Sequence, residues 1–168
     1  MQRRTLIKLG GAASALLAVV GSTAALIWPG LERGILAPAG REVFRAIAIG
    51  VLDKTLPEHP ADKQAAVTSL LIRIDALITS LPHHAQAELS QLLAILASGA
   101  GRLALAGLGT PWATASVADI QISLQSMRLS TLVMRQQAYA ALHDITAGAY
   151  FSEPTTWTVL GYPGPSRI

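Results

Sequence analysis

The sequence has no cysteine and few charged residues, and both shortages limit what kind of protein it can be. Without cysteine, the 168-residue chain can form neither disulfides nor thiolate metal sites. Charged residues make up 14% of the chain, whereas soluble domains average about 25%, so part of the folded surface is expected to be apolar. We expect another molecule to cover that surface: lipid for the first thirty residues and a protein partner for the rest.

The body of the chain also lacks an excess of positive charge. Lys and Arg number 13 against 10 Asp and Glu, and Arg3, Arg4 and Lys8 supply the whole difference. The remaining arginines are scattered, mostly singly, among apolar residues, whereas a nucleic-acid binder clusters its cations to neutralise phosphates. We therefore expect no nucleic-acid partner.

No group of residues indicates catalysis. His83 and His84 are adjacent, so their side chains diverge on a helix, unlike the i, i+4 pair of a metal site, and the same argument applies to His143 and Asp144. The chain has no Gly-x-Ser-x-Gly nucleophile motif, and its carboxylates are dispersed. Asp75, with Arg73 nearby, is expected at the surface or facing a partner. We predict that the chain is not an enzyme and holds no metal or cofactor of its own.

The first eight residues match a twin-arginine export signal. The pattern is a polar residue, an arginine pair, any residue, two apolar residues and a lysine; the chain has Gln2 where Ser or Thr is usual, followed by Arg3, Arg4, Thr5, Leu6, Ile7 and Lys8. The signal residues Arg3, Arg4, Leu6 and Lys8 predict export to the periplasm by the twin-arginine translocase. The alternative is an ordinary signal or anchor that has two arginines by chance.

The 23 residues from Leu9 to Leu31 carry no charge, and two outcomes are open for them. Ser22, Thr23 and Ala24 are small residues that suit cleavage after Ala24. As a helix, however, residues 9–31 are long enough to cross a bilayer core of about 30 Å, with Trp28 at the outer interface. The segment is either removed after export or retained as an anchor in the inner membrane.

Apolar periodicity predicts helices through most of the remaining chain. Spacings of three and four residues indicate helices over 40–56, 62–81 and 83–98, and a long helical stretch over 117–149 that breaks or kinks at Ser130. Asp62 and Ser116 are the expected N-caps, and Gly99 is the expected C-cap. No segment alternates long enough for a sheet. The fold class is therefore all-α: an apolar signal or anchor helix over 1–31, a small irregular helical bundle over 32–149 and an extended aromatic and Pro-Gly tail over 150–168.

The tail carries the most specific residues of the body. The segment begins at the end of a helix with a glycine, two adjacent aromatic residues, an acidic residue and a proline. A Trp and a final aromatic-Pro-Gly sequence follow. This order resembles the gluconate 2-dehydrogenase subunit 3 family. The matching residues are Gly148, Phe151, Pro154, Trp157, Gly161, Tyr162, Pro163 and Gly164. The step from Leu52 to Pro57 is similar to the end of the family's early helix. The family's usual insert between Pro154 and Trp157 is absent here, and the body is shorter.

The resemblance implies a partner. In such complexes, the large subunit is a glucose-methanol-choline (GMC) type oxidoreductase that carries FAD and usually has no export signal of its own. The small subunit has the twin-arginine leader and takes its folded partner across the membrane. We therefore expect a non-catalytic subunit that escorts, stabilises and, if its leader is retained, tethers an FAD-dependent dehydrogenase.

Two readings of the tail remain open. Aromatic and proline side chains suit docking because they bring contact area at low entropic cost, and the candidate partner-binding residues are Tyr150, Phe151, Pro154, Trp157, Tyr162 and Pro163. The same side chains could instead fold back onto the helical core. The alternative function is a free-standing periplasmic helical protein that binds an apolar ligand.

Overall fold

A computed structural model describes residues 29–162 and 164, and this part of the chain forms the predicted irregular helical bundle. Residues 1–28 and Pro163 lie outside the described residues, and with them Arg3, Arg4, Leu6 and Lys8 of the predicted export signal. The elements are β1 (Leu31–Glu32), β2 (Ile35–Leu36), α2 (Pro38–Val51), α3 (Pro60–Thr79), α4 (His83–Ala97), α5 (Gly99–Gly101), the π-helix η1 (Arg102–Ala106), α6 (Val117–Arg128), α7 (Val133–Phe151) and the 3-10 helix η2 (Pro154–Leu160).

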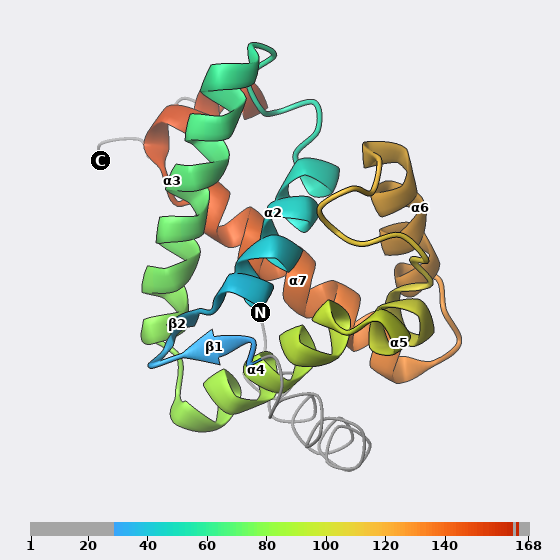
Figure 1. Cartoon of the computed structure of the whole chain (residues 1–168). Helices are drawn as coiled ribbons and strands as arrows, with labels where there is room; N and C mark the ends of the chain where they lie inside the picture. Colours follow the sequence, from blue (N-terminus) through green and yellow to red (C-terminus); the bar gives the residue numbers. More distant parts are fainter. Residues whose placement is uncertain (1–28, 163, 165–168) are drawn as a thin grey trace.

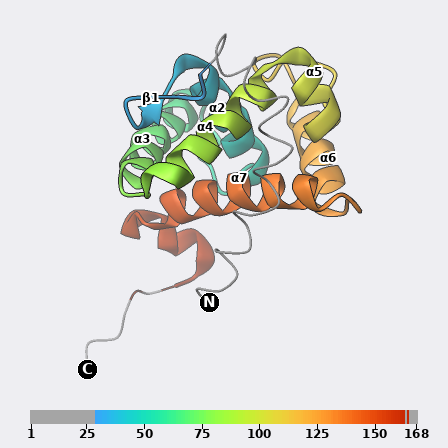
Figure 2. The same cartoon turned by 90° about the horizontal axis from the view of Figure 1, so that it is seen from below.

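α2 is the central helix of the bundle. It packs against α3, α4, α6 and α7, and Figure 1 shows it in the middle, with α3 on one side and α6 on the other. α7 runs across the bundle, with η2 folded at its C-terminal end (Figure 2). A helix that is buried on several sides is expected to be apolar around most of its circumference, and the buried residues of α2 are Gly40, Val43, Phe44, Ala46, Ile47, Ala48 and Gly50.

A glycine sets how closely α2 and α6 approach. A Cβ atom at Gly50 would lie 2.5 Å from Cγ2 of Ile120, closer than carbon atoms can pack. The amide of Gln121 adds a hydrogen bond of 3.2 Å to the Gly50 carbonyl at the same crossing. The missing side chain therefore lets the two backbones meet, which compensates for the cost of a glycine near the end of a helix.

Most helices agree with the sequence prediction, and the differences lie at their ends. α3 begins at Pro60, so Asp62 is in its first turn and is not the N-cap as predicted. The reason is that proline suits the first helical position, where no intrahelical N–H bond is lost. α2 ends at Val51, five residues before the predicted end at 56. The chain turns after Leu52, whose carbonyl accepts the N–H groups of Thr55 and Leu56, and both leucines are buried in the core.

The predicted break in the long apolar stretch is confirmed. α6 ends at Arg128 and α7 begins at Val133, with Ser130 between them. Ser116 caps α6, because its hydroxyl accepts the N–H of Asp119 at 3.1 Å. Gly99, predicted as a C-cap, instead opens α5, and Ser98 is the C-cap of α4.

Asp75 and Arg73 are used inside the fold, contrary to the prediction that they face the surface or a partner. The Asp75 carboxylate pairs with Arg41 on α2 and accepts the N–H of Leu36 at 2.8 Å. Arg73 donates from Nε to the Ala149 carbonyl at 2.9 Å. Asp75 thus ties β2 and α2 to α3, and Arg73 ties α3 to the end of α7.

The predicted extended tail over 150–168 is corrected in its described part. Tyr150 and Phe151 are the last residues of α7, and Pro154–Leu160 forms η2. Pro154 has the backbone angle that a helical first residue needs, and the Thr156 hydroxyl donates to the Glu153 carbonyl at 2.7 Å within the first turn. Gly161 ends η2 in the left-handed conformation, at φ +66°, which glycine adopts without strain.

Candidate partner interface

Tyr150 belongs to the core and not to a free surface. Only 4% of the residue is exposed, and its hydroxyl donates to the Thr55 carbonyl at 3.0 Å. Its ring meets that of Phe151 edge to face, with centroids 5.1 Å apart. Tyr150 therefore fastens the end of α7 to the α2–α3 connection, which corrects its prediction as a partner-binding residue.

Trp157 holds η2 against the end of α7. Its indole Nε1 donates to the Phe151 carbonyl at 2.7 Å, and the ring is half-buried. The Thr156 hydroxyl also lies 3.2 Å from the Tyr150 carbonyl. These bonds satisfy carbonyl groups that the last turn of a helix leaves without partners. The segment after α7 is therefore fixed by hydrogen bonds and not only by its proline.

Tyr162 packs on Trp157 and extends the exposed aromatic surface. The two rings are tilted by 56° with centroids 5.4 Å apart, and Tyr162 is 49% exposed. The backbone N–H of Tyr162 donates to the Trp157 carbonyl at 3.2 Å, which keeps the pair together. We call Trp157 and Tyr162 the aromatic pair. Val159 of η2 and Pro154 are also exposed beside it.

A groove of about 610 Å³ separates η2 from α3 and the α2–α3 connection. Glu58 and Glu153 bring negative charge to it and Arg73 brings positive charge, while Leu56 and Val159 contribute apolar surface. The remaining lining residues are Thr55, Pro57, Ala66, Ser69, Tyr150, Thr155 and Thr156. Charged, hydroxyl and apolar groups therefore all line the groove, and η2, which contains Trp157, forms one of its walls.

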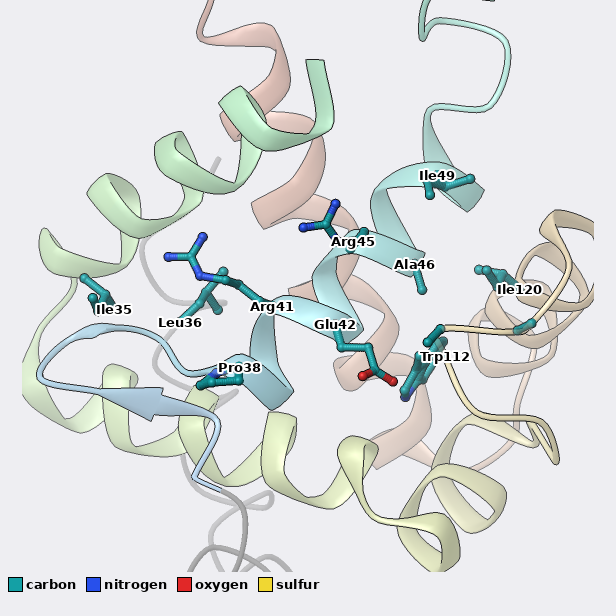
Figure 3. Close-up of a pocket in the computed structure, with 12 residues that line it drawn as sticks. Ile35, Leu36, Pro38, Arg41, Glu42, Arg45, Ala46, Ile49, Trp112 and Ile120 are labelled. Carbon is teal, nitrogen blue, oxygen red and sulfur yellow. The ribbon is translucent and has the colours of Figure 1, made fainter. Parts of the chain in front are cut away.

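A second groove of about 650 Å³ crosses the outer side of α2. Figure 3 shows Arg41, Glu42 and Arg45 of α2 along it, with Trp112 and Ile120 at one end and Ile35 at the other. Trp112 is buried, and its Nε1 donates to the Leu96 carbonyl at 2.7 Å. The groove is therefore apolar at its two ends and charged along its middle.

The histidines form no metal site in the described part of the chain. No group of three or more His, Cys, Asp or Glu side chains among residues 29–162 and 164 could hold a metal ion. His83 and His84 are exposed at the start of α4. His143 and Asp144 do meet, at 3.0 Å between Nδ1 and Oδ1, although adjacent helical positions were expected to diverge. The ring of Tyr139 stacks on His143 one turn earlier and sets its orientation.

Among the described residues, no single helix is long and apolar enough to cross a membrane. α4 together with the segment Gly99–Ala106 passes such a test by length and composition, but the two are bent by 91° at their junction. The predicted anchor over 9–31 lies almost wholly outside the described residues.

No family model, curated protein or solved structure matches the chain. The resemblance to the gluconate 2-dehydrogenase subunit 3 family therefore stays a prediction that rests on the residues quoted for it.

Of the predicted partner-binding residues, the described ones fall into three groups by exposure. Tyr150 is buried, Phe151 and Trp157 are half-buried, and Pro154 and Tyr162 are exposed. The sequence analysis missed the groove on α2, because its walls come from segments more than sixty residues apart. It also missed three exposed apolar residues in the α6–α7 turn, Leu129, Leu132 and Val133, although their position between two helices was a usable signal.

Proposed function

We propose that the chain is the non-catalytic small subunit of an exported dehydrogenase complex, and that it escorts an FAD-dependent GMC-type oxidoreductase through the twin-arginine translocase. It stabilises that partner in the periplasm, and residues 9–31 tether the pair to the inner membrane if the leader is retained. The observation that carries the proposal is the twin-arginine motif on a chain whose C-terminal residues resemble those of the family's small subunits.

Two features of the described surface support a partner role. The aromatic pair is only partly covered by the chain itself, and aromatic side chains at a surface are frequent anchors of protein interfaces. The neighbouring groove offers carboxylates and an arginine to a polar rim. We assign the partner's docking to Trp157, Tyr162 and Pro154, with Phe151 supporting them from beneath.

The export step is tested by replacing both Arg3 and Arg4 with lysine in the full chain. We expect both this protein and its flavoprotein partner to stay in the cytoplasm, because the translocase reads the arginine pair and the partner travels with it. Cell fractions are assayed for the chain by immunoblot and for the partner by flavin fluorescence. The matched control is Arg33→Lys, an exposed arginine outside the leader. Export of the partner in the double variant would contradict the escort role.

The groove on α2 favours a second candidate, a free-standing periplasmic protein that binds an apolar ligand. Its apolar ends, built from Ile35, Trp112 and Ile120, could hold aliphatic groups. Purification of the full chain from its native cells separates the two functions. A co-purifying flavoprotein supports the subunit role, whereas a monomer that carries lipid-like molecules supports ligand binding.

A further inference from the structure

The turn between α6 and α7 presents large aliphatic side chains to solvent. Leu129, Leu132 and Val133 are 67%, 60% and 59% exposed. The turn has a defined shape, because the Ser130 hydroxyl accepts the N–H of Leu132 at 3.1 Å and the Gln136 amide donates to the Ser130 carbonyl at 2.7 Å. Three apolar side chains are thus held outward by a hydrogen-bonded turn, where burial in the core is the usual fate of such residues.

Two arginines flank this turn, and a third lies on η1, which packs against both α6 and α7. Arg128 is exposed at the last position of α6. Arg135, in the first turn of α7, donates from Nη2 to the Ser126 hydroxyl at 3.1 Å and from Nε to the Leu105 carbonyl at 2.8 Å. Arg102 donates from Nε to the Leu108 carbonyl at 3.2 Å, three residues after the Leu105 carbonyl that Arg135 binds. The fold therefore brings together cations that are far apart in the sequence.

The charges of these arginines are not neutralised by neighbouring carboxylates. Their partners are carbonyl, hydroxyl and amide oxygens, and none of the three forms an ion pair within the described part of the chain. Between Gly99 and Leu142 the sequence has a single acidic residue, Asp119. It lies in the first turn of α6, at the opposite end of that helix from Arg128, and its carboxylate is held by Ser116. The local charge is positive.

We propose that this cationic corner, made of Leu129, Leu132 and Val133 with Arg102, Arg128 and Arg135, docks on the anionic surface of a lipid bilayer. Aliphatic side chains enter the interface while arginines, through their long apolar stems, keep their charges at the headgroups. The site is separate from the leader and from the aromatic pair. The inference goes beyond the proposed function, because it requires neither a flavoprotein nor a retained anchor.

Position and composition favour a bilayer over a protein as the occupant. Figures 1 and 2 both show the start of α7 at the outer edge of the bundle, so the α6–α7 turn lies at the periphery of the fold. It has no aromatic residue, whereas protein interfaces are enriched in Trp and Tyr that fill pockets. Aliphatic side chains at a peripheral turn, with uncompensated cations around them, fit a soft anionic surface that closes around them.

A single label at position 132 tests the docking directly. Because the chain has no cysteine, the full-length Leu132→Cys variant accepts one environment-sensitive fluorophore. On vesicles of phosphatidylcholine and phosphatidylglycerol we expect a blue-shifted emission that lipid-borne nitroxide quenches. The matched control is Ile72→Cys, an equally exposed aliphatic position on α3, at 62%. A leader in the membrane brings both labels to the vesicle, but only position 132 is expected to enter it.

The contribution of charge is tested by adding Arg128→Gln to the labelled Leu132→Cys chain. We expect the ratio of docked to undocked label to fall about fivefold on vesicles that contain phosphatidylglycerol, and added salt to weaken docking in the parent. Lys54→Gln removes an exposed cation on the connection after α2 and is expected to leave the ratio unchanged. Within residues 29–162 and 164, the Arg128 side chain makes one hydrogen bond, to Gln125, so its loss does not threaten the fold.

Two results would overturn the proposal. Equal responses of the labels at 132 and 72 would show that the corner does not enter the bilayer. A response at 132 that requires the purified flavoprotein, and does not occur on vesicles alone, would assign the corner to a protein. Failure of the escort role leaves the vesicle measurement unaffected, so the two proposals can fail separately.

Discussion

The C-terminal aromatic segment and the α6–α7 turn both expose apolar side chains, at opposite ends of α7, but they are built differently. In the first, Trp157 and Tyr162 contact each other, and Trp157 is hydrogen-bonded to the end of α7. Glu153 and Glu58 lie in the groove beside it. In the second, three aliphatic side chains contact mainly solvent, and the charged groups around them are arginines.

This difference shows why exposed apolar area alone does not identify what covers it. A partly buried aromatic pair is pre-ordered and loses little conformational entropy on binding, which suits a protein interface. Leucine and valine on a peripheral turn offer no pocket, and the cations around them attract an anionic surface. The sign of the local charge and the rigidity of the side chains separate the two regions.

The largest expected effect is a loss of stability when Tyr150, the buried residue at the start of the aromatic segment, is truncated. Tyr150→Ala should lower the free energy of unfolding by about 3–5 kcal/mol, because it empties a buried aromatic site that joins α7 to the α2–α3 connection. Tyr150→Phe keeps the ring and removes only the bond to Thr55, so a loss of about 1 kcal/mol is expected. Urea denaturation followed by circular dichroism measures both. A loss under 1 kcal/mol for the alanine variant would refute the role of Tyr150 in fastening this end.

Two surface substitutions test whether the aromatic segment and the α6–α7 turn bind different targets. Tyr162→Ser should weaken binding to the flavoprotein about tenfold, because an exposed aromatic anchor is lost, and should leave vesicle docking unchanged. Leu132→Ser should weaken vesicle docking and leave binding to the flavoprotein unchanged. Binding is measured by titration with the purified flavoprotein. Docking is measured by nitroxide quenching of a fluorophore on Leu129→Cys, because a leader in the membrane would make every variant float with the vesicles. If either variant impairs both activities, the two regions act as one surface.

The smallest expected effect is a gain in stability within α7, the helix that joins the two regions. The Thr146 hydroxyl is buried and has no hydrogen-bond partner in the described part of the chain. Thr146→Val keeps the shape and removes the unsatisfied group, so the free energy of unfolding should rise by about 1 kcal/mol. Thr68→Val, at an exposed position of α3, should change it by under about 0.5 kcal/mol. Binding to the flavoprotein and docking on vesicles should both be unchanged. A loss of stability in Thr146→Val would indicate that the Thr146 hydroxyl has a hydrogen-bond partner.

Local signals predicted the elements of the fold. The capping hydroxyl of Ser116 and the polar break at Ser130 each act within one turn of chain, so their effects follow from neighbouring residues. The predictions that failed depended on residues far apart. Asp75 looked like a surface carboxylate because nothing near it in the sequence announced Arg41, 34 residues earlier.

The candidate site was only partly predictable for the same reason. The composition of the tail indicated aromatic contacts but did not say which ring faces inward. Tyr150 is buried and its hydroxyl donates to Thr55, 95 residues away along the chain, whereas Tyr162 packs beside Trp157 and stays 49% exposed. Burial of an aromatic side chain is a property of the packed helices around it, which no local pattern reports.

The sequence alone determines the all-α class, the absence of disulfides, the match to an export motif and the balance of positive and negative charges in the body. Each of these depends on composition or on residues close together. Tertiary structure alone decided which aromatic rings are buried and which segments the arginines bind. Arg102, Arg128 and Arg135 are scattered singly in the sequence. In the fold, Arg102 and Arg135 bind carbonyl groups of one segment, at Leu108 and Leu105, and Arg135 also reaches Ser126, two residues before Arg128. Charge acts through distance in space, and only the fold determines that distance.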